Sequence, residues 1–122
     1  MKNILYVEDD AINALVMTKL LKSVFNVAHV FDGETCMHHV EEKPFDAILM
    51  DINLGKGKMD GVQTLHKLRA IPRLNAMPVI AVTSYALPED RERFLQEGFD
   101  AYMSKPVDRA ELIALLARVL SL

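Results

Sequence analysis

The sequence predicts an α/β fold, a doubly wound five-stranded parallel sheet with five helices. Short apolar segments alternate along the chain with segments that have helical periodicity, which is typical of right-handed crossovers between parallel strands. The apolar segments are continuous runs, as expected for strands that are buried on both faces. The 122 residues suffice for one domain and leave no room for a second.

The first half of the chain contains three predicted strands and two helices. Asp10 is a suitable N-cap for the first helix, which should turn apolar residues at helical spacing toward the core. Those residues are Ile12, Leu15, Val16 and Leu20. Asp32-Gly33 ends the second strand, and Pro44 ends the second helix. In order, we expect a strand at 4–7, a helix at 11–24, a strand at 27–31, a helix at 34–42 and a strand at 45–50.

The second half contains two predicted strands and three helices. Pro88 suits the first turn of a helix and Gly98 its end, and Asp108 is a suitable cap for the last helix. The last helix has a broad apolar arc, which fits either wide packing on the sheet or a partner-binding face. In order, we expect a loop at 52–60, a helix at 61–70, a strand at 79–82, a helix at 89–97, a strand at 101–103 and a helix at 109–120.

Composition and charge argue against several classes of protein. The chain is 51% hydrophobic and 25% charged, with a formal net charge of −3. This balance is typical of a globular domain and argues against direct nucleic-acid binding, which needs a basic face. No apolar run is long enough to span a membrane, so we expect no membrane association. The single Cys36 cannot form an internal disulfide, so a reducing compartment, the cytoplasm, fits best.

Polar side chains directly follow the apolar runs that we expect to be strands. Doubly wound sheets bind ligands at the carboxyl ends of their strands, so these side chains should meet at one edge. They belong to Glu8, Asp9, Asp51, Thr83, Ser84 and Lys105. Crowded carboxylates repel one another unless a cation shares the site, and a set of oxygen ligands suits Mg²⁺ better than zinc.

This set of residues predicts an aspartyl-phosphate site. A carboxylate beside Mg²⁺ and an ammonium group can attack phosphorus, because both cations offset charge on the transferred group. Asp51 is the expected nucleophile, Glu8 and Asp9 are the expected metal acids, and Lys105 is the charge partner. Thr83 would donate its hydroxyl to a phosphoryl oxygen.

With these motifs the sequence resembles the response-regulator receiver domain of two-component signalling, over essentially the whole chain. The motifs are Val7-Glu8-Asp9-Asp10, Met50-Asp51-Ile52-Asn53, Met59-Asp60-Gly61, Val82-Thr83-Ser84 and Tyr102-Met103-Ser104-Lys105-Pro106. The resemblance implies a flavodoxin-like fold with strand order 2-1-3-4-5 and a cis Lys105-Pro106 bond. That fold uses the whole chain, so we expect a single receiver domain over residues 1–122 with no output domain.

The resemblance also implies a reaction and a metal. Asp51 would take a phosphoryl group from the phosphohistidine of a histidine kinase or of a histidine phosphotransfer protein. Mg²⁺ would be held by Asp9, Asp51 and the main-chain carbonyl of Asn53, with Glu8 acting through water. The domain would catalyse only its own phosphorylation and dephosphorylation, so we do not expect an enzyme that turns over a metabolite.

Thr83 and Tyr102 match the switch pair of the family. After phosphorylation the hydroxyl would move to the phosphoryl group, and the ring would turn inward to fill the space. The fourth helix, fifth strand and fifth helix would then bind an effector that the sequence does not identify. A homodimer through this face stays open, although Ala101 and Leu115 stand where DNA-binding relatives often carry an acid and a base.

The loop after Asp51 departs from the family pattern. It is longer than the usual spacing, and Gly55 replaces a common proline. Lys56, Gly57 and Lys58 follow, so we expect a mobile, basic loop beside the site.

Two other functions are weighed against the phosphoacceptor module. A receiver-fold interaction domain that does not use phosphate would not need the full set of acids, Thr83 and Lys105. A phosphatase of the haloacid-dehalogenase type needs a second Asp two residues after the nucleophile. Asn53 stands there and cannot donate a carboxylic proton.

Overall fold

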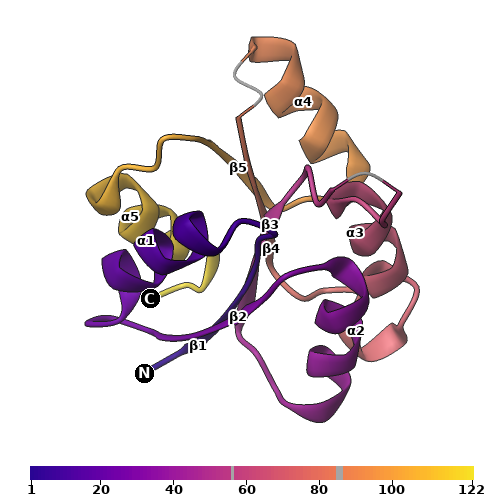
Figure 1. The fold of residues 1–122 in the computed structure, drawn as a ribbon, viewed down its shortest axis with the longest axis horizontal. Coiled ribbons are helices and arrows are strands. Elements are labelled where there is room, and N and C mark those ends of the chain that lie inside the picture. Colours follow the sequence, from indigo (N-terminus) through magenta and orange to yellow (C-terminus); the bar gives the residue numbers. More distant parts are fainter. Residues whose placement is uncertain (56, 85–86) are drawn as a thin grey trace.

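A central parallel sheet organises the chain, as the computed structural model in Figure 1 shows for residues 1–55, 57–84 and 87–122. The strand order is β2-β1-β3-β4-β5, and every neighbouring pair is parallel. The strands are β1 (Asn3–Val7), β2 (Asn26–Val30), β3 (Ala47–Asp51), β4 (Val79–Thr83) and β5 (Ala101–Ser104). The predicted doubly wound α/β fold with order 2-1-3-4-5 is therefore confirmed.

Helices cover both faces of this sheet, with α1 and α5 on one side and α2, α3 and α4 on the other (Figure 1). The helices are α1 (Ala11–Leu21), α2 (Gly33–Glu42), α3 (Gly61–Arg69), α4 (Pro88–Glu97) and α5 (Arg109–Val119), with a 3₁₀ turn, η1 (Pro72–Leu74), before β4. No described helix is long and apolar enough to cross a bilayer. In α5, Leu112 and Leu116 are buried, and several other apolar residues pack on the same core, so much of the predicted apolar arc is used in packing on the sheet.

The helix ends follow the signals in the sequence. The Asp10 side chain accepts hydrogen bonds from two amides of α1, at 2.8 and 2.9 Å. Asp108 accepts one from the Glu111 amide at 2.9 Å. Gly98 ends α4 in the left-handed region, with φ 119°. The two aspartate caps satisfy amide groups at helix starts, and the Gly98 amide donates to the Leu95 carbonyl at the end of α4.

Two predicted boundaries are wrong by two or three residues, and the others agree with the structure to within one residue. The first helix ends at Leu21 rather than Val24, because Phe25 must enter the core, where it is 2% exposed. The amides of Val24 and Phe25 bond back to the Leu21 carbonyl, which closes a tight turn before β2. The third strand begins at Ala47 rather than Phe45.

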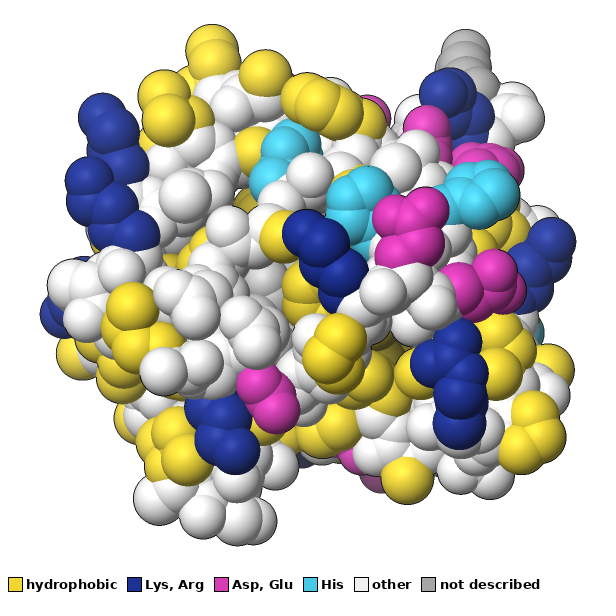
Figure 2. All heavy atoms as spheres, turned by 90° about the horizontal axis from the view of Figure 1, so that it is seen from below, with side chains coloured by type: hydrophobic (Ala, Val, Ile, Leu, Met, Phe, Trp, Pro, Cys, Tyr) yellow, Lys and Arg dark blue, Asp and Glu magenta, His cyan; other side chains and the backbone are white. Residues whose placement is uncertain are grey.

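The predicted core face of the first helix is also wrong. Ile12, Leu15 and Val16 are 73%, 56% and 52% exposed, and only Leu20 of the predicted set packs against the core. The buried residues of α1 are Ala14, Met17 and Leu21. The helix is apolar on nearly all sides, so periodicity alone does not select the face, whereas the small Ala14 lets the helix approach the sheet closely. Figure 2 shows hydrophobic side chains gathered at its upper left, on the side of the molecule where α1 lies.

Two leucines of α1 should therefore respond very differently to truncation. Leu21→Ala empties a site that is 0% exposed and should lower the free energy of unfolding by about 2–4 kcal/mol. Leu15→Ala removes a side chain that is already largely in water and should change it by less than about 0.5 kcal/mol. Urea unfolding of both variants measures the difference. A Leu15→Ala loss as large as that of Leu21→Ala would contradict this assignment of the buried face.

Candidate functional site

The carboxyl ends of β1, β3 and β4 and the turn after β5 enclose one polar cavity of about 360 Å³. Val7 pairs with Met50 in the sheet, so Glu8 and Asp51 follow at neighbouring positions. The cavity lining contains all of the predicted site residues except Tyr102: Glu8, Asp9, Asp51, Asn53, Thr83 and Lys105. Residues separated by almost a hundred positions meet there because all the strands run parallel.

Three carboxylates form an acidic cluster at the floor of this cavity. One oxygen each of Glu8, Asp9 and Asp51 lies within 4.8 Å of the other two. Glu8 and Asp51 are 1% and 5% exposed, whereas Asp9 is exposed at the mouth. The Asn53 amide donates to Asp51 Oδ1 at 3.3 Å, which brings the Asn53 backbone to the same spot. An oxygen-only donor set that is open to water on one side fits Mg²⁺, which keeps part of its water shell.

Lys105 is the cation of the cluster. Its Nζ donates to Glu8 Oε1 at 2.7 Å and lies 3.4 Å from Asp51 Oδ2. The Lys105-Pro106 bond is cis, as expected from the resemblance. The ammonium group therefore stands beside both buried acids, at the place where charge would develop on a group bound to Asp51.

The pKa shifts of Glu8, Asp51 and Lys105 indicate that the cluster holds more negative than positive charge. Burial, followed by the hydrogen bond to Glu8 and its charge, raises the pKa of Asp51 to about 7. Burial alone would also raise the pKa of Glu8, but its interactions with Asp51, Lys105 and Tyr6 outweigh this and hold it well below its usual value. Burial alone would lower the pKa of Lys105, but the two acids hold it above its usual value. One ammonium group does not balance these acids, and a divalent cation would.

This imbalance predicts a pH-dependent stability in EDTA. The folded-state pKa of Asp51, about 7, lies above the unfolded-state value, so its stabilising proton is present at low pH and is lost as pH rises through 7. Asp51→Asn removes this loss and should stabilise the metal-free protein at pH 8 by an amount on the order of 2–4 kcal/mol. The gain should shrink toward pH 4. Urea unfolding across this range tests it, and a gain that does not change with pH would be evidence against the shifted Asp51.

Thr83 and Tyr102 lie on the α4 side of the sheet. Thr83 is 1% exposed at the end of β4 and lines the cavity. Ala81 pairs with Tyr102 across β4 and β5, so the two polar residues are diagonal neighbours on one face. The half-buried Tyr102 ring stacks on Phe94 of α4, with centroids 6.1 Å apart. Thr83 thus lines the acidic site, and Tyr102, its diagonal neighbour in the sheet, packs on α4.

Tyr6 and Asn13 belong to the site but are not among the residues that the sequence predicted for it. Asn13 and Gly55 line the cavity, and Tyr6 donates to a carboxylate of the cluster. The strand period of two places Tyr6 and Glu8 on one face, and this signal was available in the sequence.

In the loop after β3, Gly55 and Gly57 adopt positive φ, and Lys58 pairs with Asp32 at 3.6 Å. Lys56 of the predicted basic loop lies outside the described residues.

Comparisons with known proteins agree with this geometry. The family model of the response regulator receiver domain matches residues 4–117. The chain is 31% identical to the signal transduction histidine-protein kinase BarA of Escherichia coli K12 over 116 residues, 94% of this chain but 12% of BarA. It is 32% identical to the transcriptional regulatory protein ZraR of the same organism over 120 residues, 98% of this chain and 26% of ZraR. The chain thus spans a small part of each of these relatives.

A solved structure is similar over its whole length. The receiver domain of the sensor histidine kinase PA1611 from Pseudomonas aeruginosa PAO1 superposes with a TM-score of 0.88 and 38% identity, covering 99% of this chain and 98% of that one. That structure has a magnesium ion coordinated in the active site cleft.

Proposed function

The chain belongs to the response regulator receiver domain family, and we propose that it is a phosphoacceptor module in which Asp51 takes a phosphoryl group from a partner's phosphohistidine. The observation that carries this proposal is a cluster of three carboxylates, two of which, Glu8 and Asp51, contact the Lys105 ammonium group. Asp51 is almost fully buried, is flanked by Glu8 and Asp9, and lies 3.4 Å from Lys105 Nζ. A buried carboxylate beside an ammonium group and a possible metal site is suited to accept a charged phosphoryl group.

The residues divide the reaction between them. An Asp51 carboxylate oxygen attacks phosphorus, the P–N bond to the partner's imidazole breaks, and the imidazole leaves with the electron pair. Mg²⁺ held by Asp9, Asp51 and the Asn53 carbonyl, with Glu8 acting through water, would supply positive charge to the phosphoryl oxygens. Lys105 supplies the second positive charge and already stands beside Glu8 and Asp51, so its charge needs little reorganisation during the reaction.

Thr83 and Tyr102, the switch pair, then respond to the charge of the phosphoryl group on Asp51. Thr83 donates its hydroxyl to a phosphoryl oxygen, which draws the end of β4 toward the site. The Tyr102 ring, now stacked on Phe94, turns into the space that Thr83 leaves. The face of α4, β5 and α5 changes with it, and phosphorylation shifts a pre-existing equilibrium between two shapes of that face.

The partners follow from this reaction. A histidine kinase or a histidine phosphotransfer protein donates the phosphoryl group, and an effector, or a second copy of the chain, reads the α4–β5–α5 face. The domain also hydrolyses its own aspartyl phosphate. We place the reaction in the cytoplasm, where the buried Cys36 stays a free thiol.

The two alternative functions are not favoured. A domain that binds partners without phosphate has no need to bury Glu8 and Asp51 against each other, since that arrangement is electrostatically unfavourable without a cation. A haloacid-dehalogenase-type phosphatase lacks its general acid, because Asn53 occupies that position.

Incubation with acetyl phosphate and Mg²⁺ tests the proposal. Intact-mass measurement should show one added phosphoryl group on the wild type, none on Asp51→Asn, and none on the wild type in EDTA. Asp46→Asn, which changes a half-buried acid just before β3, at the opposite end of that strand from Asp51, should gain the group like the wild type. No gain in the wild type, or an equal gain in Asp51→Asn, refutes the phosphoacceptor assignment.

A further inference from the structure

Tyr6 is an unusual member of a strand that is otherwise aliphatic in its buried part. It lies in the middle of β1 with 1% of its surface exposed, and it packs with the core on the α1 and α5 side. Glu8 directly follows β1 and is two residues from Tyr6. Side chains two residues apart along a strand lie on the same face of the sheet. The phenol thus stands directly beneath the carboxylate at the end of the strand.

The Tyr6 hydroxyl uses this position to bind the acidic cluster. It donates to Glu8 Oε1 at 2.9 Å, in a buried hydrogen bond. The same oxygen accepts from Lys105 Nζ at 2.7 Å. Glu8 Oε2 has a weaker contact, 3.4 Å, from the Asp10 amide. One carboxylate oxygen of Glu8 is therefore fixed from two sides, and the orientation of the whole carboxylate is fixed with it.

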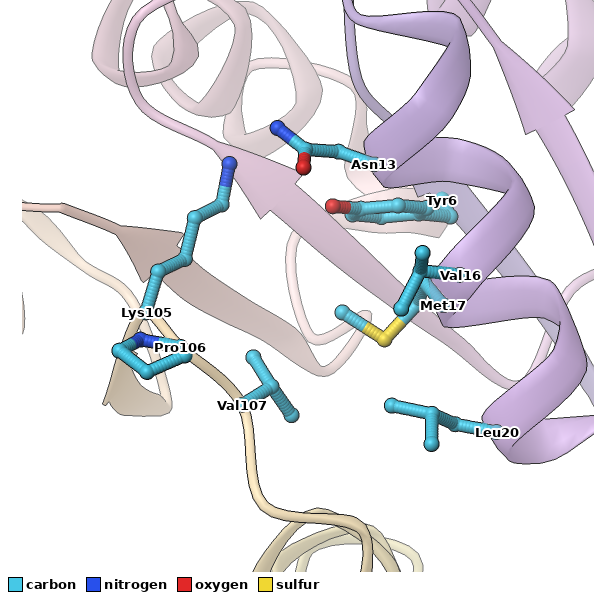
Figure 3. A pocket seen from close by; sticks show the side chains of 8 residues that line it. All are labelled: Tyr6, Asn13, Val16, Met17, Leu20, Lys105, Pro106 and Val107. Atoms are coloured by element: carbon cyan, nitrogen blue, oxygen red, sulfur yellow. The ribbon is translucent and has the colours of Figure 1, made fainter.

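The surroundings show that this orientation is built into the fold. Figure 3 shows the Tyr6 ring lying against α1, with its hydroxyl pointing toward the side where Asn13 and Lys105 lie. Val16, Met17 and Leu20 continue the wall below it, around an apolar cavity of about 180 Å³. A buried tyrosine hydroxyl needs a hydrogen-bond partner. These three apolar side chains offer none, and the hydroxyl donates to Glu8, so the carboxylate holds the phenol and the phenol in turn holds Glu8.

We propose that Tyr6 is a positioning residue for the metal site, which it prepares by orienting the Glu8 carboxylate through its hydroxyl. This inference rests on the proposed function in one respect, namely that Glu8 contributes to Mg²⁺ binding. Groups that orient a metal-binding carboxylate by a hydrogen bond typically change metal affinity about 10- to 100-fold when they are removed. Tyr6 does not line the polar cavity but bonds to Glu8, so its effect must pass through Glu8.

Tyr6→Phe tests this with the smallest possible change, because it removes one oxygen and keeps the ring in the core. Calorimetric titration with Mg²⁺ should show a dissociation constant raised about tenfold or more. The phosphorylation rate from acetyl phosphate should fall by the same factor at low Mg²⁺ and recover at saturating Mg²⁺. Thr18→Val is the matched control, because it removes a hydroxyl on the same side of the sheet that donates to the Ala14 carbonyl within α1. It should leave the Mg²⁺ dissociation constant unchanged.

A double variant shows whether the effect passes through Glu8. In a Glu8→Ala background the phenol has no carboxylate to orient, so adding Tyr6→Phe should not change Mg²⁺ affinity further. An equal loss in both backgrounds, or unchanged affinity in Tyr6→Phe alone with only a lower melting temperature, overturns the proposal. Because the Mg²⁺ titration needs no phosphorylation, it still decides the role of Tyr6 if the wild type takes up no phosphoryl group. A wild type that binds no Mg²⁺ overturns both proposals.

Discussion

Lys105→Met should slow phosphorylation by acetyl phosphate by about 100-fold or more, because it removes a positive charge fixed next to the reacting carboxylate. In the wild type, Lys105 Nζ lies 2.7 Å from Glu8 Oε1 and 3.4 Å from Asp51 Oδ2. The same change therefore leaves both acids buried without their cation. Breaking a buried ion pair by removing one partner destabilises a protein by about 3 kcal/mol or more. Intact-mass time courses measure the rate, and urea unfolding in EDTA measures the stability.

Lys58→Met is the matched control for this variant. Lys58 also lies near the site, but its side chain is 57% exposed and pairs with Asp32 at 3.6 Å. Exposed pairs of this kind contribute about 0–1 kcal/mol, so the control should behave almost like the wild type. If Lys105→Met and Lys58→Met had similar rates and stabilities, the ammonium group of Lys105 would have no special role.

Gly61→Ala should destabilise the fold strongly and slow phosphorylation as well. A Cβ at Gly61 would lie 2.4 Å from the Asp51 carbonyl oxygen and 2.8 Å from Ile52 Cα. Both are backbone atoms, so neither can move aside without displacing the end of β3. The Gly61 amide also bonds to the Ile52 carbonyl at 2.9 Å, so α3 begins directly on the segment that carries the acceptor.

The expected loss is on the order of 3 kcal/mol, the upper range for overpacking. Gly57→Ala serves as the comparison, because its Cβ would meet no atom of the described residues within 4 Å although φ is +72°. It should lose only about 1 kcal/mol, from the left-handed backbone. Urea midpoints and phosphorylation rates of both variants check this. Equal losses in the two variants would mean that the close approach of α3 to Asp51 is not what makes glycine necessary.

The site was largely predictable because parallel strands bring their carboxyl ends to one edge. Glu8, Asp51 and Lys105 could be placed together from their positions after apolar runs, without knowing any distance. The pairing between them could not be predicted in the same way. That Glu8 Oε1 accepts from both Tyr6 and Lys105 depends on rotamers that the order of residues does not determine.

The buried face of the first helix could not be predicted from the sequence either. Ile12, Leu15 and Val16 have the helical spacing of a core face, yet they are exposed, and Ala14 and Met17 are buried instead. A helix that is apolar on most sides can pack in several rotations, and the shape of the sheet beneath it decides among them. Tertiary packing, rather than local pattern, selected the buried face here.

The most direct test of the central claim is to locate the phosphoryl group. Wild-type protein treated with acetyl phosphate and Mg²⁺ is reduced with borohydride, which converts an aspartyl phosphate to homoserine, and is then mapped by peptide mass spectrometry. Homoserine should appear at position 51. A reduced residue at Glu8 or Asp9 instead, in the same cluster of carboxylates, would contradict the assignment of Asp51 as the acceptor.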